Sequence, residues 1–404
     1  MEFARRLADI PPYLFAELNQ KKARMIAEGI DVIDLSIGDP VPELPTPDHI
    51  VEVLREAALR PEYQNYPDYN GCPEFRQAVA EYYRRRFNVE LDWASEVTAL
   101  NGAKEGLAHL IWAVIDKGDV ALVPDPGYPV YATQVRLAGG APHFMPLTEA
   151  NGFKPDLDQI PAKVAEAARL MIINYPNNPT GAVVEAAYIQ EVVDFCRQRD
   201  IILCYDNAYA ETTFDGYVAP SVLEFDGAME IAVETYSLSK PFNMTGWRIG
   251  AAVGNRKIID ALRRIKTNVD TGVFTPVQLA AVHALKSSPE TVFSRSNSVY
   301  ERRRDAALAG FSSLGWELPV TKGSFYIWLP VPEGHDGGSF AQLLLEELAV
   351  VVAPGATWGS NGMNYVRVAL TVEEERIREA IQRMKDAGIR GFISAGAAAG
   401  ISPV

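Results

Sequence analysis

The feature that most constrains the fold of this chain is an alternation of short apolar runs with helix-period segments through its middle. The apolar runs that end in a polar loop lie at 119–128, 169–181, 200–209 and 230–240, and helical segments such as 185–199 lie between them. Strands that alternate with helices indicate βαβ units and a mostly parallel sheet. Because ligands bind at the carboxyl ends of the strands in such sheets, we expect functional residues in the four polar loops.

The C-terminal third has a different pattern. Segments 320–332 and 362–371 are typical of antiparallel strands, and 371–388 is typical of a helix. Thr371 and Glu374 fit a capping box at the start of this helix, and Gly388 suits the left-handed position after its end. We infer a smaller α+β domain. The predicted boundaries are 1–45 for the N-terminal part of the small domain, 46–292 for the large domain, 293–388 for the C-terminal small domain and 389–404 for a Gly/Ala-rich tail.

Composition limits the classes of function. The chain has 404 residues, 48% hydrophobic and 22% charged, which is typical of a soluble globular protein. Its formal net charge of −14 argues against nucleic acid or an anionic membrane as a partner, because both need a basic face. Cys72, Cys196 and Cys204 form no Cys-x-x-Cys pair and the histidines have no ligand spacing, so we expect a reducing compartment and no metal site. We recognise neither a secretion signal nor a membrane span, and expect a cytoplasmic protein.

The polar residues of the four loops form a chemically consistent set. Asn178 lies in "NNPTG", Asp206 and Tyr209 lie in "DNAY", Lys240 ends "SLSK", and Arg248 follows eight residues later. Pyridoxal 5'-phosphate needs such a set: a lysine amine for its aldehyde, a carboxylate for its ring nitrogen, donors for its phenolate oxygen and an anion site for its phosphate. A carboxylate beside the ring nitrogen raises the pKa of that nitrogen and keeps the ring protonated.

These motifs carry a resemblance to a known family. "SLSKPFNMTGWRIG", "NNPTG" and "DNAY" resemble, in order and separation, the signatures of class I/II pyridoxal-phosphate aminotransferases of fold type I. The resemblance extends from "LSIGDP" to "YVRVAL", nearly the whole chain. It implies an α/β fold with a large domain, in which a mostly parallel seven-stranded sheet lies between helices, and a smaller α+β domain. Within the family, "PPYLFAEL", "DPGYPVY" and "SLSKPFNMTGWRIGAAVGN" look most like the LL-diaminopimelate aminotransferase group.

The resemblance implies roles for individual residues around the cofactor ring. Lys240 should form the internal aldimine and then move the proton between the substrate Cα and the cofactor. Asp206 should hold the ring nitrogen, while Asn178 and Tyr209 bond the ring oxygen. Tyr128 resembles the aromatic residue that stacks on the ring.

Further roles concern the phosphate and the substrate. The phosphate should be held by Arg248, Ser237 and Ser239, and by the loop and helix N-terminus that carry Ala103 and Lys104. Arg367 should bind the substrate α-carboxylate, beside Gly38. The same resemblance places Tyr13, Asn178 and Tyr128 at the substrate, and it implies a homodimer in which Tyr66 reaches the phosphate of the neighbouring subunit.

The implied function is transamination between an L-amino acid and a 2-oxo acid, with glutamate and 2-oxoglutarate as one pair and LL-diaminopimelate as the expected substrate. The chain departs from the LL-diaminopimelate group in the loop "YPDYNG", where that group has a glutamate, and near Thr275, where it has an asparagine. Alanine, aspartate or a specialised amino acid therefore stays open as substrate, as does a lyase reaction on the same fold. An effector-sensing module without catalysis is disfavoured, because we find no helix-turn-helix segment and the chain is acidic.

Overall fold

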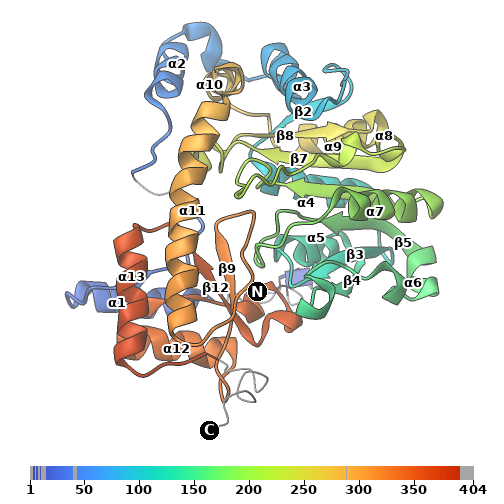
Figure 1. Ribbon diagram of the computed structural model, residues 1–404. Helices are drawn as coiled ribbons and strands as arrows, with labels where there is room; N and C mark the ends of the chain where they lie inside the picture. Colours follow the sequence, from blue (N-terminus) through green and yellow to red (C-terminus); the bar gives the residue numbers. More distant parts are fainter. Residues whose placement is uncertain are drawn as a thin grey trace.

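The computed structural model describes residues 3–4, 6–7, 10, 15–39, 43–287 and 289–391. Its centre is a seven-stranded sheet with the order β2-β8-β7-β6-β5-β3-β4, covered by helices on both faces (Figure 1). β8 is antiparallel to both of its neighbours, and every other pair is parallel. The strands are β2 (Val97–Leu100), β3 (Val120–Asp125), β4 (Ala141–Pro146), β5 (Ala168–Ile173), β6 (Ile202–Asn207), β7 (Ala232–Ser237) and β8 (Gly250–Gly254).

The helices of this part follow from the same alternation. They are α2 (Asp48–Ala58), α3 (Pro73–Phe87), α4 (Ala103–Val114), α5 (Val130–Ala138), α6 (Ala162–Ala167), α7 (Ala186–Gln198), α8 (Ala228–Ile231), α9 (Arg256–Val269) and α10 (Thr275–Lys286). In β5, Leu170 and Ile172 pack into the core under α4, α5 and α9, while Met171 and Ile173 pack into the core under α3, α7 and α10. Successive side chains of a strand point to opposite faces, so burial of both faces requires the continuous apolar runs seen in the sequence.

A second unit follows the long helix α11 (Pro289–Ser313), which runs from beside α10 to beside α12 (Figure 1). It contains a three-stranded antiparallel sheet with the order β11-β12-β9 and a parallel pair of β1 with β10. Its other elements are α1 (Phe15–Ala27), β1 (Ile33–Asp34), β9 (Tyr326–Pro330), α12 (Gly337–Leu348), β10 (Val350–Val351), β11 (Ala353–Pro354), β12 (Tyr365–Ala369) and α13 (Glu374–Asp386). Ile33 and Leu35 pack into the core of this unit. The boundaries at 45, 292 and 388 stay predictions.

Short 3₁₀ turns join several of these elements. They are η2 (Pro61–Gln64), η3 (Glu149–Asn151), η4 (Leu157–Gln159), η5 (Val222–Glu224), η6 (Thr245–Trp247), η7 (Gly355–Trp358) and η8 (Ser360–Gly362). Two of them, η6 and η7, border the polar site described below.

The expected α/β fold with a mostly parallel seven-stranded sheet is confirmed, but the expected capping box is wrong. α13 begins at Glu374, and no side chain caps it at Glu373. Thr371 lies two residues before the N-cap, too early to cap the helix, and its hydroxyl donates to the Ile37 carbonyl at 2.6 Å. Gly388 adopts φ +75°, as predicted for the position after the helix end. Of the predicted tail, 392–404 lies outside the described residues.

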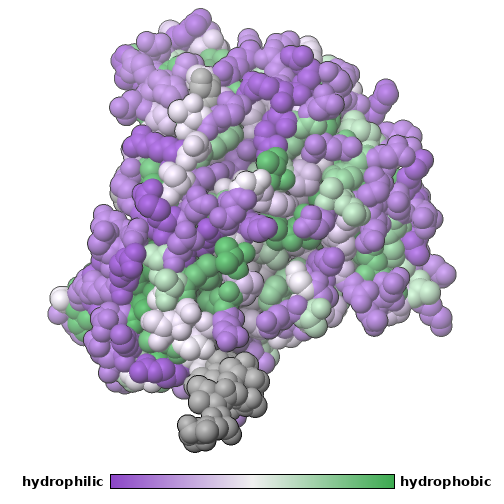
Figure 2. Space-filling model, viewed as in Figure 1, coloured by the Kyte–Doolittle hydropathy of each residue, from purple (hydrophilic) through white to green (hydrophobic). Residues whose placement is uncertain are grey.

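The surface and the cysteines agree with the composition. Hydrophilic side chains dominate the outline of the face in Figure 2, and hydrophobic side chains gather nearer its middle. Cys72, Cys196 and Cys204 are free and buried. Among the described residues, no helix combines the length and the apolarity needed to cross a bilayer.

Candidate active site

A cavity of about 620 Å³ lies where the carboxyl ends of β5, β6 and β7 face the second unit. It gathers most of the side chains that the sequence singled out: Ala103, Lys104, Tyr128, Asn178, Asp206, Tyr209, Ser237, Ser239, Lys240, Arg248 and Arg367. Parallel strands bring their carboxyl ends to one edge of a sheet, which is why residues from segments far apart in the chain meet there.

Asp206 is the buried acid of the cavity. It lies near the end of β6, and its side chain accepts hydrogen bonds from the Tyr131 hydroxyl at 2.7 Å and the Thr235 hydroxyl at 3.0 Å. Burial raises the pKa of Asp206, and the two hydrogen bonds act in the opposite direction. The Asn174 amide holds the Asp206 carbonyl at 2.6 Å. A carboxylate fixed in this way is suited to a cationic N–H group, since such a group offsets the cost of burying its charge.

Lys240 follows β7 and also lines the cavity. Its Nζ donates to the Gly38 carbonyl at 2.6 Å and lies 5.6 Å from the centre of the Phe325 ring. Burial lowers the pKa of the Lys240 ammonium, an effect that Tyr326 and Asp39 oppose. A lysine with a lowered pKa loses its proton more readily, and it can then act as a nucleophile or a base.

Arg367 lies in β12 and is 7% exposed. Its Nη1 donates to Asn178 Oδ1 and its Nη2 to the Ser36 carbonyl, both at 2.8 Å, while the rings of Tyr326 and Trp358 lie 4.0 and 4.3 Å from its Cζ. Its buried Nε–H has no hydrogen-bond partner among the described residues. An unsatisfied N–H on a fixed guanidinium suits a carboxylate ligand.

Tyr209 and Asn178 are held on the same side of the cavity. The hydroxyls of Tyr209 and Tyr326 lie 3.1 Å apart, and the backbone N–H of Asn178 donates to Asn174 Oδ1 at 2.9 Å. Burial raises the pKa of Tyr209 well above its ordinary value, so its hydroxyl keeps its proton and remains a donor. Both side chains can therefore bond an oxygen of a bound ring.

The third part of the cavity is an anion site. α4 begins at Ala103, after Gly102 with φ +79°, and the first N–H groups of a helix lack acceptors within the helix. Arg248 lies beside this turn: its Nη1 donates to the Thr245 carbonyl at 2.8 Å and its Nη2 to the Asn101 carbonyl at 3.5 Å. A side chain at position 102 would collide with the Arg248 guanidinium. The hydroxyls of Ser237 and Ser239 border the same space.

Three predicted residues lie elsewhere. Gly38 does not line this cavity, although its carbonyl accepts from Lys240 and it borders an adjoining hollow with Arg367. Tyr66 is 88% exposed and does not reach the cavity of its own chain. Tyr13 lies outside the described residues.

The sequence interpretation missed several residues that hold the site: Tyr131, Thr235, Asn174 and Tyr326. Two of them carried a signal. Thr235 is a polar residue within an apolar strand, and Asn174 directly follows one. Tyr131 lies in the first turn of α5, three residues after Tyr128, and Tyr326 gives no sign of its role in the sequence.

The chain matches known proteins over nearly its whole length. The family model for aminotransferase class I and II matches residues 30–384. The LL-diaminopimelate aminotransferase of Moorella thermoacetica is 50% identical over 385 residues, covering 95% of this chain and 98% of that protein. LL-diaminopimelate aminotransferase 2 of Trichormus variabilis is 49% identical, covering 96% and 100%. The substrate-bound structure of BacF from Bacillus subtilis superimposes with a TM-score of 0.92 at 38% identity, covering 96% of this chain and 99% of that one.

A match of this extent, together with an amine, an acid and a guanidinium meeting in one cavity, identifies the family. The chain belongs to the class I and II aminotransferases.

Proposed function

We propose that this aminotransferase uses pyridoxal 5'-phosphate bound in the described cavity and transfers an amino group from LL-diaminopimelate to 2-oxoglutarate, or in the reverse direction. The observation that carries the proposal is the position of three groups around one cavity: the buried Asp206 carboxylate, the Lys240 amine and the Arg367 guanidinium. The same wall contains the first N–H groups of α4 and Arg248, which suit a phosphate.

The cofactor fits the residues that are present. Burial raises the pKa of Asp206, and a protonated ring nitrogen beside it would stabilise the ionised carboxylate. Asn178 and Tyr209 would bond the ring oxygen, Tyr128 would stack on the ring, and Ser237, Ser239, Arg248, Ala103 and Lys104 would hold the phosphate. When bound, the cofactor supplies an aldehyde for amine exchange and a ring that accepts the electrons released at Cα.

The remaining steps belong to the side chains of the chain. The substrate amine would take the place of the Lys240 amine on the cofactor aldehyde, and the released Lys240 amine, whose pKa is lowered by burial, would then move the proton at Cα. Arg367 binds the α-carboxylate through its unsatisfied Nε–H and the adjacent Nη groups. Transamination then proceeds in two half-reactions, one for each substrate.

LL-diaminopimelate is supported by the two relatives described above, both of which are LL-diaminopimelate aminotransferases. The loop 66–71 and Thr275 differ from what the sequence interpretation expected of that group, so the alternatives are alanine, aspartate or a specialised amino acid, and a lyase reaction. Thr275 begins α10.

A homodimer completes the proposal. Tyr66, Tyr69 and Phe274 are 88, 47 and 44% exposed, although each is large and apolar or aromatic. Such residues gather at interfaces between subunits. We place the dimer contact on these residues, with Tyr66 reaching the phosphate site of the second copy, and we place the enzyme in the cytoplasm, where its three free cysteines stay reduced.

Two measurements test the cofactor. Purified protein supplied with pyridoxal 5'-phosphate should be yellow, and sodium borohydride should remove the colour and fix the cofactor to the peptide that contains Lys240. Lys240→Ala should bind the cofactor without being labelled and should show negligible turnover. Wild-type protein that stays colourless after reconstitution would contradict the cofactor proposal.

A half-reaction screen tests the substrate. LL-diaminopimelate, glutamate, alanine and aspartate are added singly, and the loss of cofactor absorbance is followed in each case. We expect LL-diaminopimelate and glutamate to react, and meso-diaminopimelate serves as the stereochemical control. Release of ammonia or sulfide would instead reveal a lyase.

A further inference from the structure

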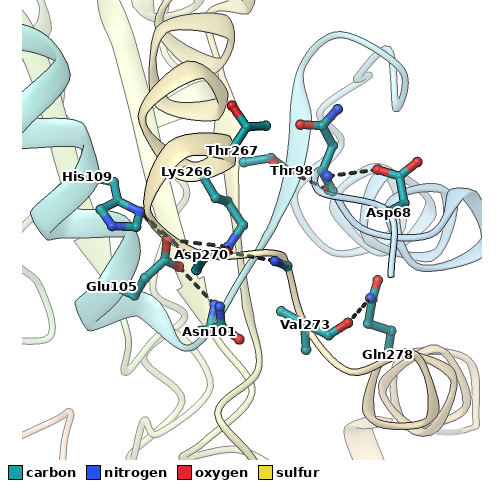
Figure 3. Close-up of polar contacts among 12 residues, drawn as sticks. Asp68, Thr98, Asn101, Glu105, His109, Lys266, Thr267, Asp270, Val273 and Gln278 are labelled. Carbon is teal, nitrogen blue, oxygen red and sulfur yellow. Dashed lines mark hydrogen bonds and ion pairs between the residues drawn. The ribbon is translucent and has the colours of Figure 1, made fainter. Parts of the chain in front are cut away.

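Behind the anion site lies a buried ion cluster that the proposed reaction does not use: Glu105, His109, Lys266 and Asp270. Figure 3 shows Glu105 and His109 from α4 facing Lys266 and Asp270 at the end of α9. Lys266 Nζ lies 2.9 Å from Asp270 Oδ1 and 3.4 Å from Glu105 Oε1, and His109 Nδ1 contacts Glu105 Oε1. The Lys266 side chain is 0% exposed. None of the four lines the cavity.

The second carboxylate oxygen of Glu105 connects the cluster to the anion site. Glu105 Oε2 accepts a hydrogen bond from the backbone N–H of Asn101 at 2.9 Å (Figure 3). The Asn101 carbonyl accepts from Arg248 on the other side of the same residue. The turn 101–103 is therefore held between Glu105 in the interior and Arg248 at the cavity, and it carries the first free N–H groups of α4.

The Lys266 ammonium contacts the carboxylates of both Glu105 and Asp270. A hydrogen bond to an ionised carboxylate is about twice as strong as one between neutral groups. Burial tends to raise the pKa of Asp270, but the bonds from Lys266 and from the Gly272 N–H outweigh it and lower that pKa. Ligand atoms of Glu105, His109 and Asp270 also lie within 4.8 Å of one another, as in a metal site, but the Lys266 ammonium already supplies the cation there.

The other end of the cluster fixes the segment after Tyr66. Asp270 Oδ1 accepts from the Gly272 N–H at 2.8 Å, and Gly272, with φ +92°, packs against the Asp68 carbonyl. Gln278 then donates to the Val273 carbonyl at 2.6 Å and accepts from the Cys72 N–H at 2.7 Å. One ammonium thus braces both the anion-binding turn and the 68–72 segment.

We propose that Glu105 is a positioning residue for the cofactor phosphate: held by Lys266, it fixes the turn 101–103 so that the N–H groups of Ala103 and Lys104 point into the cavity before a phosphate binds. This inference rests on the proposed function, because it assumes that the anion is the phosphate of pyridoxal 5'-phosphate. Glu105 itself touches neither cofactor nor substrate, so its effect is specific to the phosphate end.

The test compares pyridoxal 5'-phosphate with pyridoxal, which lacks the phosphate, by titrating each into the full-length cofactor-free chain. Glu105→Ala removes the carboxylate that accepts the hydrogen bond from the backbone N–H of Asn101. Its dissociation constant for pyridoxal 5'-phosphate should rise about tenfold or more, the loss expected for one hydrogen bond to a charged group, while that for pyridoxal stays within about twofold. The matched control is Asp215→Asn. This variant weakens the ion pair, 2.5 Å long, between Asp215 and the buried Arg304 of α11, and it should change neither dissociation constant.

Equal losses for both aldehydes, or no loss, would overturn the proposal, since a general structural role would weaken both. If Glu105→Ala does not fold, Glu105→Gln tests the proposal instead. Its neutral amide keeps an acceptor oxygen but makes a weaker hydrogen bond. The ratio of the dissociation constants of pyridoxal and pyridoxal 5'-phosphate should therefore fall about threefold. An unchanged preference in that variant overturns the proposal. A wild-type chain that binds neither aldehyde refutes the proposed function instead.

Discussion

At the scale of single residues, burial gives ordinary side chains their chemistry. Arg367 is fixed by Asn178, the Ser36 carbonyl and two aromatic rings, and this leaves one buried N–H for a ligand. Burial raises the pKa of Asp206, and the hydrogen bonds from Tyr131 and Thr235 oppose this effect. Both properties depend on neighbours that come from other segments of the chain.

The first prediction concerns the geometry of Arg367. Arg367→Lys keeps the positive charge but loses the planar fork and the contact with both rings, so KM for every amino acid substrate should rise about tenfold or more. Arg367→Ala should cost about 2–5 kcal/mol of kcat/KM, as for truncation of a buried paired charge. Cofactor absorbance should be unchanged in both variants. Steady-state kinetics measures the effect, and a KM equal to that of wild type would remove Arg367 from the substrate site.

A second prediction concerns the support of Asp206. Tyr131→Phe removes one of the two side-chain donors to this carboxylate, so the pKa of Asp206 should rise further and its hold on the ring nitrogen should weaken. We expect cofactor affinity to fall about fivefold, the effect of one net hydrogen bond. Tyr188→Phe is the control, because that buried hydroxyl donates to the distant Pro155 carbonyl. Equal effects in the two variants would show that only packing had been lost.

At the scale of elements, one side chain fastens the second unit to the sheet. Asp125, at the end of β3, is 3% exposed and accepts from the Ser360 hydroxyl at 2.8 Å and from the Asn361 side chain at 3.0 Å. The neighbouring Gly127 N–H donates to the Trp358 carbonyl at 2.8 Å. Since Trp358 packs on Arg367, this contact joins the loop of the large sheet to the carboxylate site.

Loss of this contact gives the third prediction. Asp125→Ala removes the acceptor of the 360–361 loop, whose residues are exposed and can hydrogen-bond to water instead, so the free energy of unfolding should fall by about 1–2 kcal/mol, and KM for the amino acid should rise about fivefold while cofactor affinity stays the same. Asp125→Asn, which keeps an acceptor oxygen, should show a smaller change in both. Thermal unfolding and half-reaction rates provide the measurements. A fall in the free energy of unfolding without any rise in KM would show that this contact does not support substrate binding.

At the scale of the whole molecule, the free energy of unfolding should depend on pH through one buried carboxyl of the central sheet. Glu234 lies in β7 and accepts from Ser221, the Val222 N–H, Asn207 and Tyr83 at 2.6–3.0 Å. Burial nevertheless raises its pKa to about 7 from an ordinary value of 4.5. The folded chain therefore holds a proton at Glu234 over a pH range in which the unfolded chain has released it.

The fourth prediction follows from that difference. The contribution of Glu234 is fully present below about pH 4.5 and is lost as the pH rises to about 7, because the folded state binds more protons in this window. The free energy lost is on the order of 3 kcal/mol. Glu234→Gln cannot titrate, so the gap between its unfolding free energy and that of wild type should change across this window and stay constant above it. Urea unfolding at several pH values measures the gap, and parallel curves would contradict the assignment.

Much of this architecture was predictable because it depends on local order. The runs at 119–128, 200–209 and 230–240 contain β3, β6 and β7, the run at 169–181 contains β5 except for its first residue, and 185–199 contains α7. Apolar runs of this length can be buried only between two helical layers, which fixes the sheet. The capping box at Thr371 was wrong because the helix begins at Glu374, two residues later than the box requires, and helix boundaries are the part of a sequence pattern that is least defined.

The sequence by itself determined which chemical groups the site contains, Lys240 and Asp206 near strand ends and Arg367 within a strand, since each follows from a local motif. Only the tertiary structure decided how they are held. Tyr131 and Thr235 set the charge of Asp206, and Lys266 reaches Glu105 across 161 positions of the chain. Such partners meet because separate elements pack together. A hydrogen bond between two elements produces no periodicity or residue spacing, so the sequence gives no signal by which to predict it.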